Sequence, residues 1–435
     1  MRSVQSKRQI VLPTLLLAAA AVVACHALHW AARAAFSVPS VVTPRQQTQQ
    51  LSQKSIAPAA SRFAGVSQLS SAVVAVEPAD ESDRLAARPG MVLAATALAA
   101  VAAAAEASSS ESATEEKSSL TNVWSAVKLP VYVALWYFFN VQYNIQNKLL
   151  LKAFDASMAV SWIQMAAGIP IAGLMWLTGI LKRPKVSTAD LAKLAPVGAA
   201  FAGGQVATVA SLGAVAVSFT HVVKALEPAV NAIASAFVLG QVFHPLVYAS
   251  LLPVFAGVAL ASASELSFTL FGFATAMASN FFFVTRNVLA TKFGGVGEMG
   301  DDATTRKTNQ LAVLTAVASV VLLPLALFAP GGLLSIPAAW SKALKAGVTS
   351  NKIIYLLASS GFHFFMYQMS SFWVLSCVPP ITHSVLNTLK RVVIIVMSII
   401  VFRTPVTAQG LAGTATAIGG VLLYSLTKAH FSKKK

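Results

Sequence analysis

Apolar runs long enough to cross a bilayer recur through most of this sequence, and they restrict the fold more than any other feature. Ten such runs lie between residues 129 and 426, separated by short segments that contain Pro, Gly or charge. About 20 apolar residues make a helix that spans the hydrocarbon core, and short connections force neighbouring helices to be antiparallel. Because 56% of residues are hydrophobic and 11% charged, a soluble single-core domain is excluded. The sequence predicts an all-α integral membrane protein with ten transmembrane helices.

The ten candidate spans divide into two related sets of five. A Thr-His pair opens the fourth span at Thr220 and the ninth at Thr382, an offset of 162, and residues 257–262 resemble residues 420–425 at an offset of 163. Two matches at nearly one offset predict an internal repeat. Since each half has an odd number of spans, the two five-helix repeats would be inverted, which favours a midplane substrate site and alternating access. The predicted spans are 129–151, 158–181, 191–212, 214–239, 245–263, 266–290, 311–328, 353–378, 381–402 and 409–426.

The net charge of +17 belongs to the apolar part of the chain. Residues 1–120 contain ten Lys or Arg and eight Asp or Glu, whereas residues 121–435 contain 22 and seven. Nucleic acid is excluded as a partner because these bases lie between apolar runs rather than on a soluble face. Membrane lipid, positive-inside loops and an anionic substrate remain. Two cysteines, Cys25 and Cys377, are too few for a disulfide framework or structural zinc site, and we predict no metal or cofactor.

The first 35 residues have the pattern of a signal peptide. Basic residues precede an apolar run at 10–28, and small residues at 32–35 could form the cleavage site. A first transmembrane anchor is the alternative. Residues 36–76 contain no Asp or Glu, which is typical of a transit peptide. This bipartite leader resembles the presequences of proteins bound for complex plastids of secondary endosymbiotic origin.

The remaining domain boundaries follow from changes in composition. A weak apolar segment at 91–105 is too short and alanine-rich for a clear span, and an acidic, Ser-rich stretch at 106–117 is typical of a linker. We therefore predict a signal peptide at 1–35, a transit peptide and linker at 36–119, and a transporter domain at 120–430. Its repeats would cover about 125–264 and 265–428, followed by a basic tail at 431–435.

The distribution of basic residues predicts the orientation of the chain. Eleven lie on one side of the predicted spans and six on the other, which places both termini inside. In a plastid envelope we take that inner side to be the stroma. The first group is Lys182, Arg183, Lys185, Lys193, Lys292, Arg306, Lys307, Lys428, Lys433, Lys434 and Lys435; the second is Lys148, Lys152, Lys342, Lys345, Lys352 and Arg403.

Five ionisable residues inside the predicted spans indicate a site: Lys224, Glu227, Arg286, Lys390 and Arg391. A charge at the bilayer centre costs at least ~2.5–3.5 kcal/mol, so such residues are paired or functional. Internal pairing of Lys224 with Glu227, three positions apart on one helix, is as well supported as a binding role. No further intramembrane acid is available for the other three cations, and a bound polyanion would supply the missing charge.

Neutral polar residues in the spans are less specific. Asn140, Asn144 and Asn147 form a stripe that either joins helices or lines a cavity. His221, with His363 and His383, is more typical of helix packing than of a proton relay.

Three runs carry a resemblance to a known family. Residues 134–140, 217–228 and 382–392, on the first, fourth and ninth predicted spans, resemble the plastid phosphate translocators of the drug/metabolite transporter superfamily. The similarity covers about residues 124–428. It implies a ten-helix inverted-repeat carrier, not an enzyme, in the plastid inner envelope or another membrane of a complex plastid. It further implies exchange of inorganic phosphate for a phosphorylated three-, five- or six-carbon metabolite: triose phosphate, 3-phosphoglycerate, phosphoenolpyruvate or a sugar phosphate.

The same resemblance assigns site residues. Lys224, Lys390 and Arg391 match the phosphate clamp. Several members have a histidine where Gln205 stands, and Phe365 replaces the histidine of a His-x-Tyr pattern. Both departures leave the organic substrate open, although residues 276–280 and 402–405 resemble the phosphoenolpyruvate type. The remaining matched or associated positions are Tyr367, Thr208, Arg286 and Phe283 in the pocket, and Glu227 and His221 as orienting or structural residues.

Three other functions remain as alternatives. A nucleotide-sugar carrier of the same superfamily would not use inorganic phosphate as counter-substrate. A prenyl-diphosphate enzyme needs Mg²⁺ held by clustered acids, and Asp301 with Asp302 is the only acidic pair in the predicted transporter domain. An anion channel would conduct without internal counter-anion. We expect a monomer or homodimer.

Overall fold

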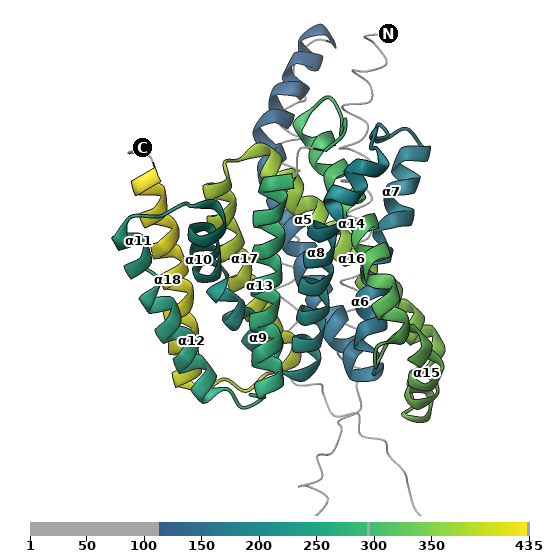
Figure 1. The fold of residues 1–435 in the computed structure, drawn as a ribbon, viewed down its shortest axis with the longest axis vertical. Helices are drawn as coiled ribbons and strands as arrows, with labels where there is room; N and C mark the ends of the chain where they lie inside the picture. The colour runs from purple at the N-terminus through teal and green to yellow at the C-terminus, as the bar shows by residue number, and fades with distance from the viewer. Residues whose placement is uncertain (1–112, 294–295, 433–435) are drawn as a thin grey trace, which may run out of the picture. The chain divides into compact units, whose positions relative to one another are not determined.

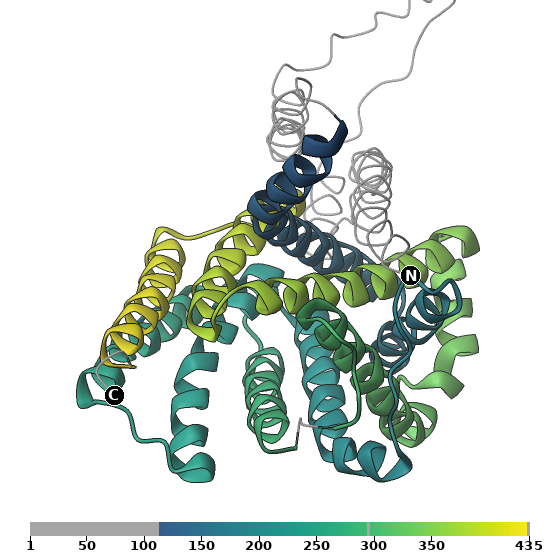
Figure 2. The ribbon, with the colours of Figure 1, turned by 90° about the horizontal axis from the view of Figure 1, so that it is seen from above.

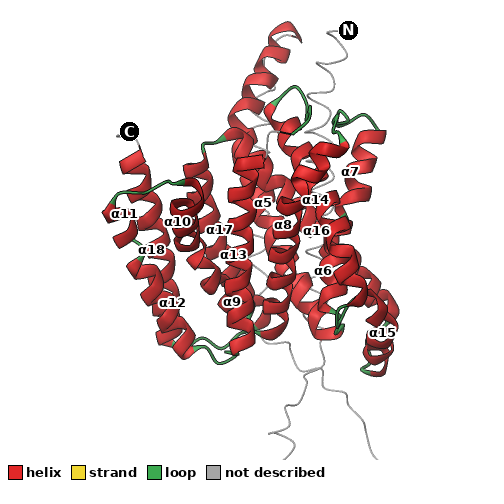
Figure 3. Ribbon diagram, viewed as in Figure 1, coloured by secondary structure: helices red, strands yellow, loops and turns green. Residues whose placement is uncertain are grey.

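The computed structural model describes residues 113–293 and 296–432 as helices and short connections (Figure 1 and Figure 3). They belong to one compact unit, Glu106–Lys435. Most of the predicted leader, including the signal peptide, the weak apolar segment and most of the linker, lies outside the described residues. The first described helix begins at Ala113, ahead of the predicted start of the transporter domain at residue 120.

The first half of this unit contains eight α-helices and one 3₁₀ turn among its described residues. α6 and α7 both lie in the second predicted span, α9, η1 and α10 in the fourth, and α11 and α12 together cover the fifth. The elements are α5 (Ala113–Ala153), α6 (Ser157–Ala166), α7 (Gly168–Leu177), α8 (Thr188–Ala214), α9 (Val217–Val223), η1 (Lys224–Leu226), α10 (Glu227–Leu239), α11 (Pro245–Ala249) and α12 (Leu252–Ser264).

The second half contains longer helices. α15 is a short helix between α14 and α16 and lies at the end of the bundle opposite the chain's C-terminus (Figure 1). The elements are α13 (Leu270–Phe293), α14 (Ala303–Phe328), η2 (Leu333–Ser335), α15 (Ile336–Lys345), α16 (Ser350–Cys377), α17 (Pro380–Phe402) and α18 (Ala408–Ser432).

Six helical segments among the described residues are long and apolar enough to cross a membrane. Together with the helical content, they confirm the predicted all-α membrane class. The segments are Ser157–Leu177, Thr188–Ala214, Pro245–Ser264, Ala303–Phe328, Thr382–Phe402 and Ala408–Phe431.

The fourth predicted span is interrupted at Lys224. Pro228 has no N–H to donate to the carbonyl of the residue four positions earlier, which is Lys224. The N–H of Glu227 bonds to that carbonyl instead, and the chain forms the 3₁₀ turn η1 before α10 begins. The sequence thus places a buried lysine at the break between α9 and α10.

Three helix pairs make the most extensive contacts in the bundle: α8 with α13, α5 with α16, and α12 with α18. Figure 2 shows the bundle from above, with α18 beside α12. A Cβ atom at Gly257 of α12 would collide with the backbone of Ala417, and one at Gly413 of α18 would collide with the backbone of Ala261. Glycine therefore allows α12 and α18 to meet backbone to backbone.

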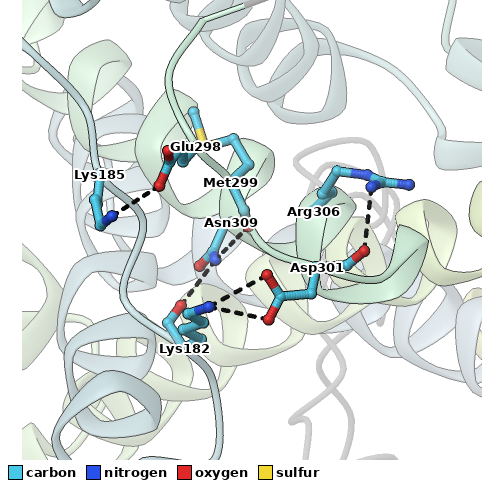
Figure 4. Close-up of polar contacts among 7 residues, drawn as sticks. All are labelled: Lys182, Lys185, Glu298, Met299, Asp301, Arg306 and Asn309. Atoms are coloured by element: carbon cyan, nitrogen blue, oxygen red, sulfur yellow. Dashed lines mark hydrogen bonds and ion pairs between the residues drawn. The ribbon is translucent and has the colours of Figure 1, made fainter.

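The connection between α7 and α8 is joined to the connection between α13 and α14 (Figure 4). Lys182 pairs with Asp301 at 3.0 Å and Lys185 with Glu298 at 2.9 Å. The backbones of Lys185 and Glu298 also exchange both hydrogen bonds. Beneath them, the fully buried amide of Asn309 donates to the carbonyls of Lys182 and Met299 at 2.9 and 2.7 Å.

Candidate functional site

Lys224 is buried at the break between α9 and α10, and its ammonium has neutral partners. Nζ donates to Ser279 Oγ at 2.6 Å and to Thr208 Oγ1 at 3.3 Å. It also lies 4.6 Å from the centre of the Phe283 ring. These contacts use two of the three donors of the ammonium and do not neutralise its charge.

Arg391 of α17 forms an ion pair with Glu227 of α10, at 2.5 Å between Nη2 and Oε2. The hypothesis that Glu227 pairs with Lys224 is therefore replaced, because the carboxylate makes its salt bridge across the bundle. The side chain of Arg391 is only 7% exposed and that of Glu227 23%. Within the described residues, Arg391 Nη1 is buried without a hydrogen-bond partner.

Lys390 faces α5 and has an aromatic partner. Its Nζ lies 4.8 Å from the centre of the Trp136 indole, within the range of a cation–π interaction. The imidazole of His383 stacks on the same indole, with 4.7 Å between ring centres and 17° between planes. Lys390 and Arg391 are adjacent in sequence, but their side chains are held by different helices.

These cations form one electrostatic cluster. Lys390 interacts with Arg391, Glu227 and Lys224, and Lys224 interacts in addition with Arg286. The three residues expected to bind phosphate thus come together from η1 and α17. Glu227 is the acid that lies among them.

Arg286 and Tyr367 lie beside this cluster among aromatic rings. The guanidinium of Arg286 lies 5.1 Å from the centre of Phe201 and 5.3 Å from that of Phe283, and it interacts electrostatically with Tyr367. The Tyr367 ring packs against Tyr143 at 5.2 Å. A Cβ at Gly204 of α8 would touch the Phe283 ring, so this glycine leaves room for the aromatic wall.

Gln205 belongs to a buried hydrogen-bond network of neutral side chains. Its Nε2 donates to the Tyr143 hydroxyl at 2.9 Å and to Gln164 Oε1 at 2.7 Å. Asn147 donates to the same hydroxyl at 3.1 Å and accepts from Gln164 Nε2 at 3.0 Å. Gln205, which stands where the resemblance implies histidine in several family members, is therefore hydrogen-bonded to a phenol and an amide. Gln205 Oε1 is left without a partner among the described side chains.

His221 is buried and hydrogen-bonded to Asn144, with 2.9 Å between Nε2 and Oδ1. Asn144 in turn donates to the Asn140 carbonyl at 2.8 Å. His363 and His383 also have neutral partners, at Ser359 and Ser371. Two members of the asparagine stripe thus support His221, and the third belongs to the Gln205 network.

Sequence reasoning did not identify Trp136, Ser279 or Tyr143 as part of this site. Trp136 was within a family-like run, but nothing in its type marks it as the partner of a lysine 254 positions away. Serine and tyrosine are equally common in helix packing, so only the fold identifies them. The described residues contain no group of three or more His, Cys, Asp or Glu that could hold a metal ion.

Comparison with known proteins gives consistent matches. Residues 127–425 match the model of the Triose-phosphate Transporter family. A Phosphoenolpyruvate/phosphate translocator 1, chloroplastic, of Oryza sativa subsp. japonica is 38% identical over 86% of this chain and 86% of its own. A Triose phosphate/phosphate translocator, non-green plastid, chloroplastic, of Brassica oleracea var. botrytis is 40% identical over 74% and 78%. A Glucose-6-phosphate/phosphate translocator 1, chloroplastic, of Arabidopsis thaliana is 38% identical over 69% and 76%.

Proposed function

The chain belongs to the Triose-phosphate Transporter family, and we propose that it is an antiporter exchanging inorganic phosphate for a phosphorylated C3, C5 or C6 metabolite. The observation that carries this proposal is the cluster of Lys224, Lys390 and Arg391 around one carboxylate. Its excess positive charge lies in apolar helices, where an anion is the missing counter-charge.

Phosphate suits this cluster better than a monovalent anion does. Each lysine contributes a point charge, and Arg391 contributes a planar fork that can bind two oxygens. A contact at ~4 Å is worth ~4 kcal/mol for each unit charge at an effective dielectric of about 20, so a divalent ligand gains the most. The proposed phosphate residues are Lys224, Lys390 and Arg391.

The organic part of the substrate would lie toward Tyr367, Arg286 and the Gln205 network. Thr208 and Phe283 hold Lys224 and so connect the two ends of the proposed pocket. Phosphoenolpyruvate, 3-phosphoglycerate, triose phosphate and sugar phosphates all have the phosphoryl group that the cations would bind. They differ at the end that these neutral residues and Arg286 would contact.

The proposed carrier has ten spans in two inverted repeats, about 125–264 and 265–428. α6 with α7, α9 with α10, and α11 with α12 would each make one span. In the two repeats α5 would correspond to α13, α8 to α16 and α10 to α17. The α8–α13 contact then corresponds to α16–α5, and the α10–α13 contact to α17–α5. All four contacts are present. Packing with this internal symmetry supports the repeat. The Glu227–Arg391 ion pair then joins one repeat to the other, where alternating access requires movement.

The proposed location is a plastid membrane, the inner envelope or another membrane of a complex plastid. The names of the relatives include "chloroplastic", and the proposed leader at 1–119 has two targeting parts. α5 begins and α18 ends at the same end of the bundle (Figure 1), which supports an even number of crossings, with both ends of the described bundle on the proposed stromal side.

Counter-exchange in liposomes tests this function. The full chain is reconstituted with phosphate or gluconate inside, and uptake of labelled phosphate, triose phosphate, phosphoenolpyruvate and glucose 6-phosphate is measured. We expect rapid uptake of phosphate and at least one organic phosphate into phosphate-loaded vesicles and almost none into gluconate-loaded ones. Equal rates would indicate a channel or uniporter, and uptake of a nucleotide sugar without phosphate exchange would indicate the other carrier class.

A further inference from the structure

Trp136 has an unusual environment for a buried tryptophan. It is 1% exposed, yet within the described residues its Nε1–H has no hydrogen-bond partner. A buried indole normally donates this hydrogen, and an unpaired buried donor destabilises the folded protein. Four other tryptophans follow the rule: Trp162 donates to the Ser319 carbonyl, Trp176 to Asn309, Trp340 to Ser350 and Trp373 to Thr308. A hydrogen bond therefore does not explain the orientation of Trp136.

The contacts of the ring with α17 do explain it. His383 stacks on the indole, and the Lys390 ammonium lies 4.8 Å from its centre. These residues are seven positions apart, two helical turns, and so lie on one face of α17. The neighbouring Tyr137 donates to the Leu386 carbonyl at 2.6 Å, between these two turns. Two consecutive aromatic residues of α5 thus fix the α17 segment that carries Lys390.

The carboxylate that interacts with Lys390, that of Glu227, already forms its salt bridge with another cation. None of the ion pairs among the described residues includes Lys390, and the nearby carboxylate of Glu227 is bound to Arg391. A desolvated ammonium is attracted to the face of an indole more strongly than to the face of phenylalanine. The indole is consequently the contact that determines where this ammonium lies in the structure without ligand.

We propose that Trp136 is a positioning residue of the phosphate site, which holds the Lys390 ammonium beside Lys224 and Arg391 both before and after an anion binds. The inference rests on the proposed function, because it takes Lys390 as a phosphate ligand. Trp136 acts through Lys390 and need not touch the substrate. On binding, the ammonium keeps its contact with the ring and gains a phosphate oxygen, so the environment of the indole changes.

Phosphate binding to the full chain in detergent, measured by calorimetry, tests the inference. Trp136→Leu should weaken binding about tenfold and Trp136→Phe less, following the strength of the cation–π contact. Trp162→Leu is the matched control, since it removes an indole held by a hydrogen bond to Ser319, and its affinity should stay within about twofold of wild type. In the Lys390→Gln background, Trp136→Leu should have no further effect on affinity. An equal additional loss there would make Trp136 a general packing residue and overturn the proposal.

Tryptophan emission provides a second measurement that does not depend on the leucine variant. Adding inorganic phosphate should change the emission of wild type and of Trp162→Phe, and the change should be absent in Trp136→Phe and in Lys390→Gln. An undiminished response in Trp136→Phe overturns the positioning role. The two proposals fail differently: normal phosphate binding by Lys390→Gln contradicts the phosphate site itself, whereas weak binding by Lys390→Gln with normal binding by Trp136→Leu contradicts only the role of Trp136.

Discussion

The carboxylate of Glu227 and the guanidinium of Arg391 form an ion pair between α10 and α17, 164 positions apart in the chain. Arg391 is therefore not free in the structure without ligand. An anionic substrate would have to share it with Glu227 or displace that carboxylate. The acid in the site is thus an internal competitor for one of the proposed phosphate ligands.

Glu227→Gln should separate the stabilising effect of this ion pair from its competition with an anionic substrate for Arg391. Removing one partner of a buried pair costs about 3–5 kcal/mol, and Glu227 is partly exposed, so we expect a loss of about 3 kcal/mol in the absence of phosphate. Phosphate should then raise the Tm more than in wild type, because Arg391 has no other counter-charge. Thermal unfolding in detergent with and without phosphate measures both changes, with Glu265→Gln as a control. An unchanged phosphate-free Tm would show that the ion pair contributes nothing.

Lys390→Gln and Arg391→Lys should impair transport of every phosphorylated substrate. The first change removes a charge, and the second keeps the charge but loses the fork that binds two oxygens. We therefore expect the larger loss for Lys390→Gln, by at least ~100-fold in kcat/KM, equivalent to about 2.7 kcal/mol. Counter-exchange at matched protein levels across four substrates measures this, with Lys307→Gln as a charge-loss control at the start of α14. If Lys390→Gln loses one organic substrate but exchanges phosphate normally, the assignment is wrong.

Gln205→His and Tyr367→Phe should change the ranking among organic substrates while leaving exchange of phosphate for phosphate within about threefold, less than 1 kcal/mol. Gln205 now donates two hydrogen bonds in a neutral network, and histidine cannot reproduce both. Competition of phosphoenolpyruvate, triose phosphate and glucose 6-phosphate against labelled phosphate gives the ranking. Equal loss of all substrates, including phosphate, would place these residues in the structural core instead.

Asn309→Ala should destabilise the junction between the two connections drawn in Figure 4. The substitution leaves the Trp176 N–H and the carbonyls of Lys182 and Met299 without their partner. At ~1 kcal/mol for each hydrogen bond, a loss of about 3 kcal/mol is expected. Thermal unfolding of the variant measures it, and Lys185→Ala, which removes only an exposed ion pair, should have little effect. If Lys185→Ala destabilised the protein more than Asn309→Ala does, the surface ion pairs rather than Asn309 would hold the junction.

The stability that the exposed ion pair Lys185–Glu298 contributes should depend on pH only outside the neutral range. Its hydrogen bond lowers the pKa of Glu298 and raises that of Lys185. The Glu298 contribution is present above the ordinary glutamate pKa, about 4.3, and is lost as pH falls through its lowered value. The Lys185 contribution is present below about 10.4 and is lost as pH rises through its raised value. Amide exchange of this junction should thus be constant from about pH 5 to 10 after correction for intrinsic rates.

Much of the fold follows from the sequence because apolar length and short connections leave few alternatives. The range expected for the first span lies within α5, and that for the sixth largely matches α13. The break at Lys224 was missed, although Pro228 four positions later signals it. The junction at Asn309 could not be predicted, because an asparagine near a helix start has no preferred long-range partner.

The charged residues of the candidate site could be proposed from sequence, but their partners could not. Glu227 is the only acidic residue between Asp190 and Glu265, and no acidic residue follows Asp302. That distribution limits the acids available to Arg391, so the ion pair could have been considered. Spacing along one helix favoured Lys224 instead. Trp136 and Ser279 are neutral, and the sequence contains no signal that pairs them with a lysine.

The backbone contact between α12 and α18 has a consequence for motion. At Gly257 and Gly413 the two helices have no side chains between them, so they cannot slide past each other without collision. If one half rotates against the other, α12 and α18 would therefore stay in contact, and the axis of rotation would lie at this contact. The opening would be widest at the helices farthest from it. A bulky residue at either glycine would push the two helices apart at this axis and block the rotation, and so stop transport without contacting the substrate.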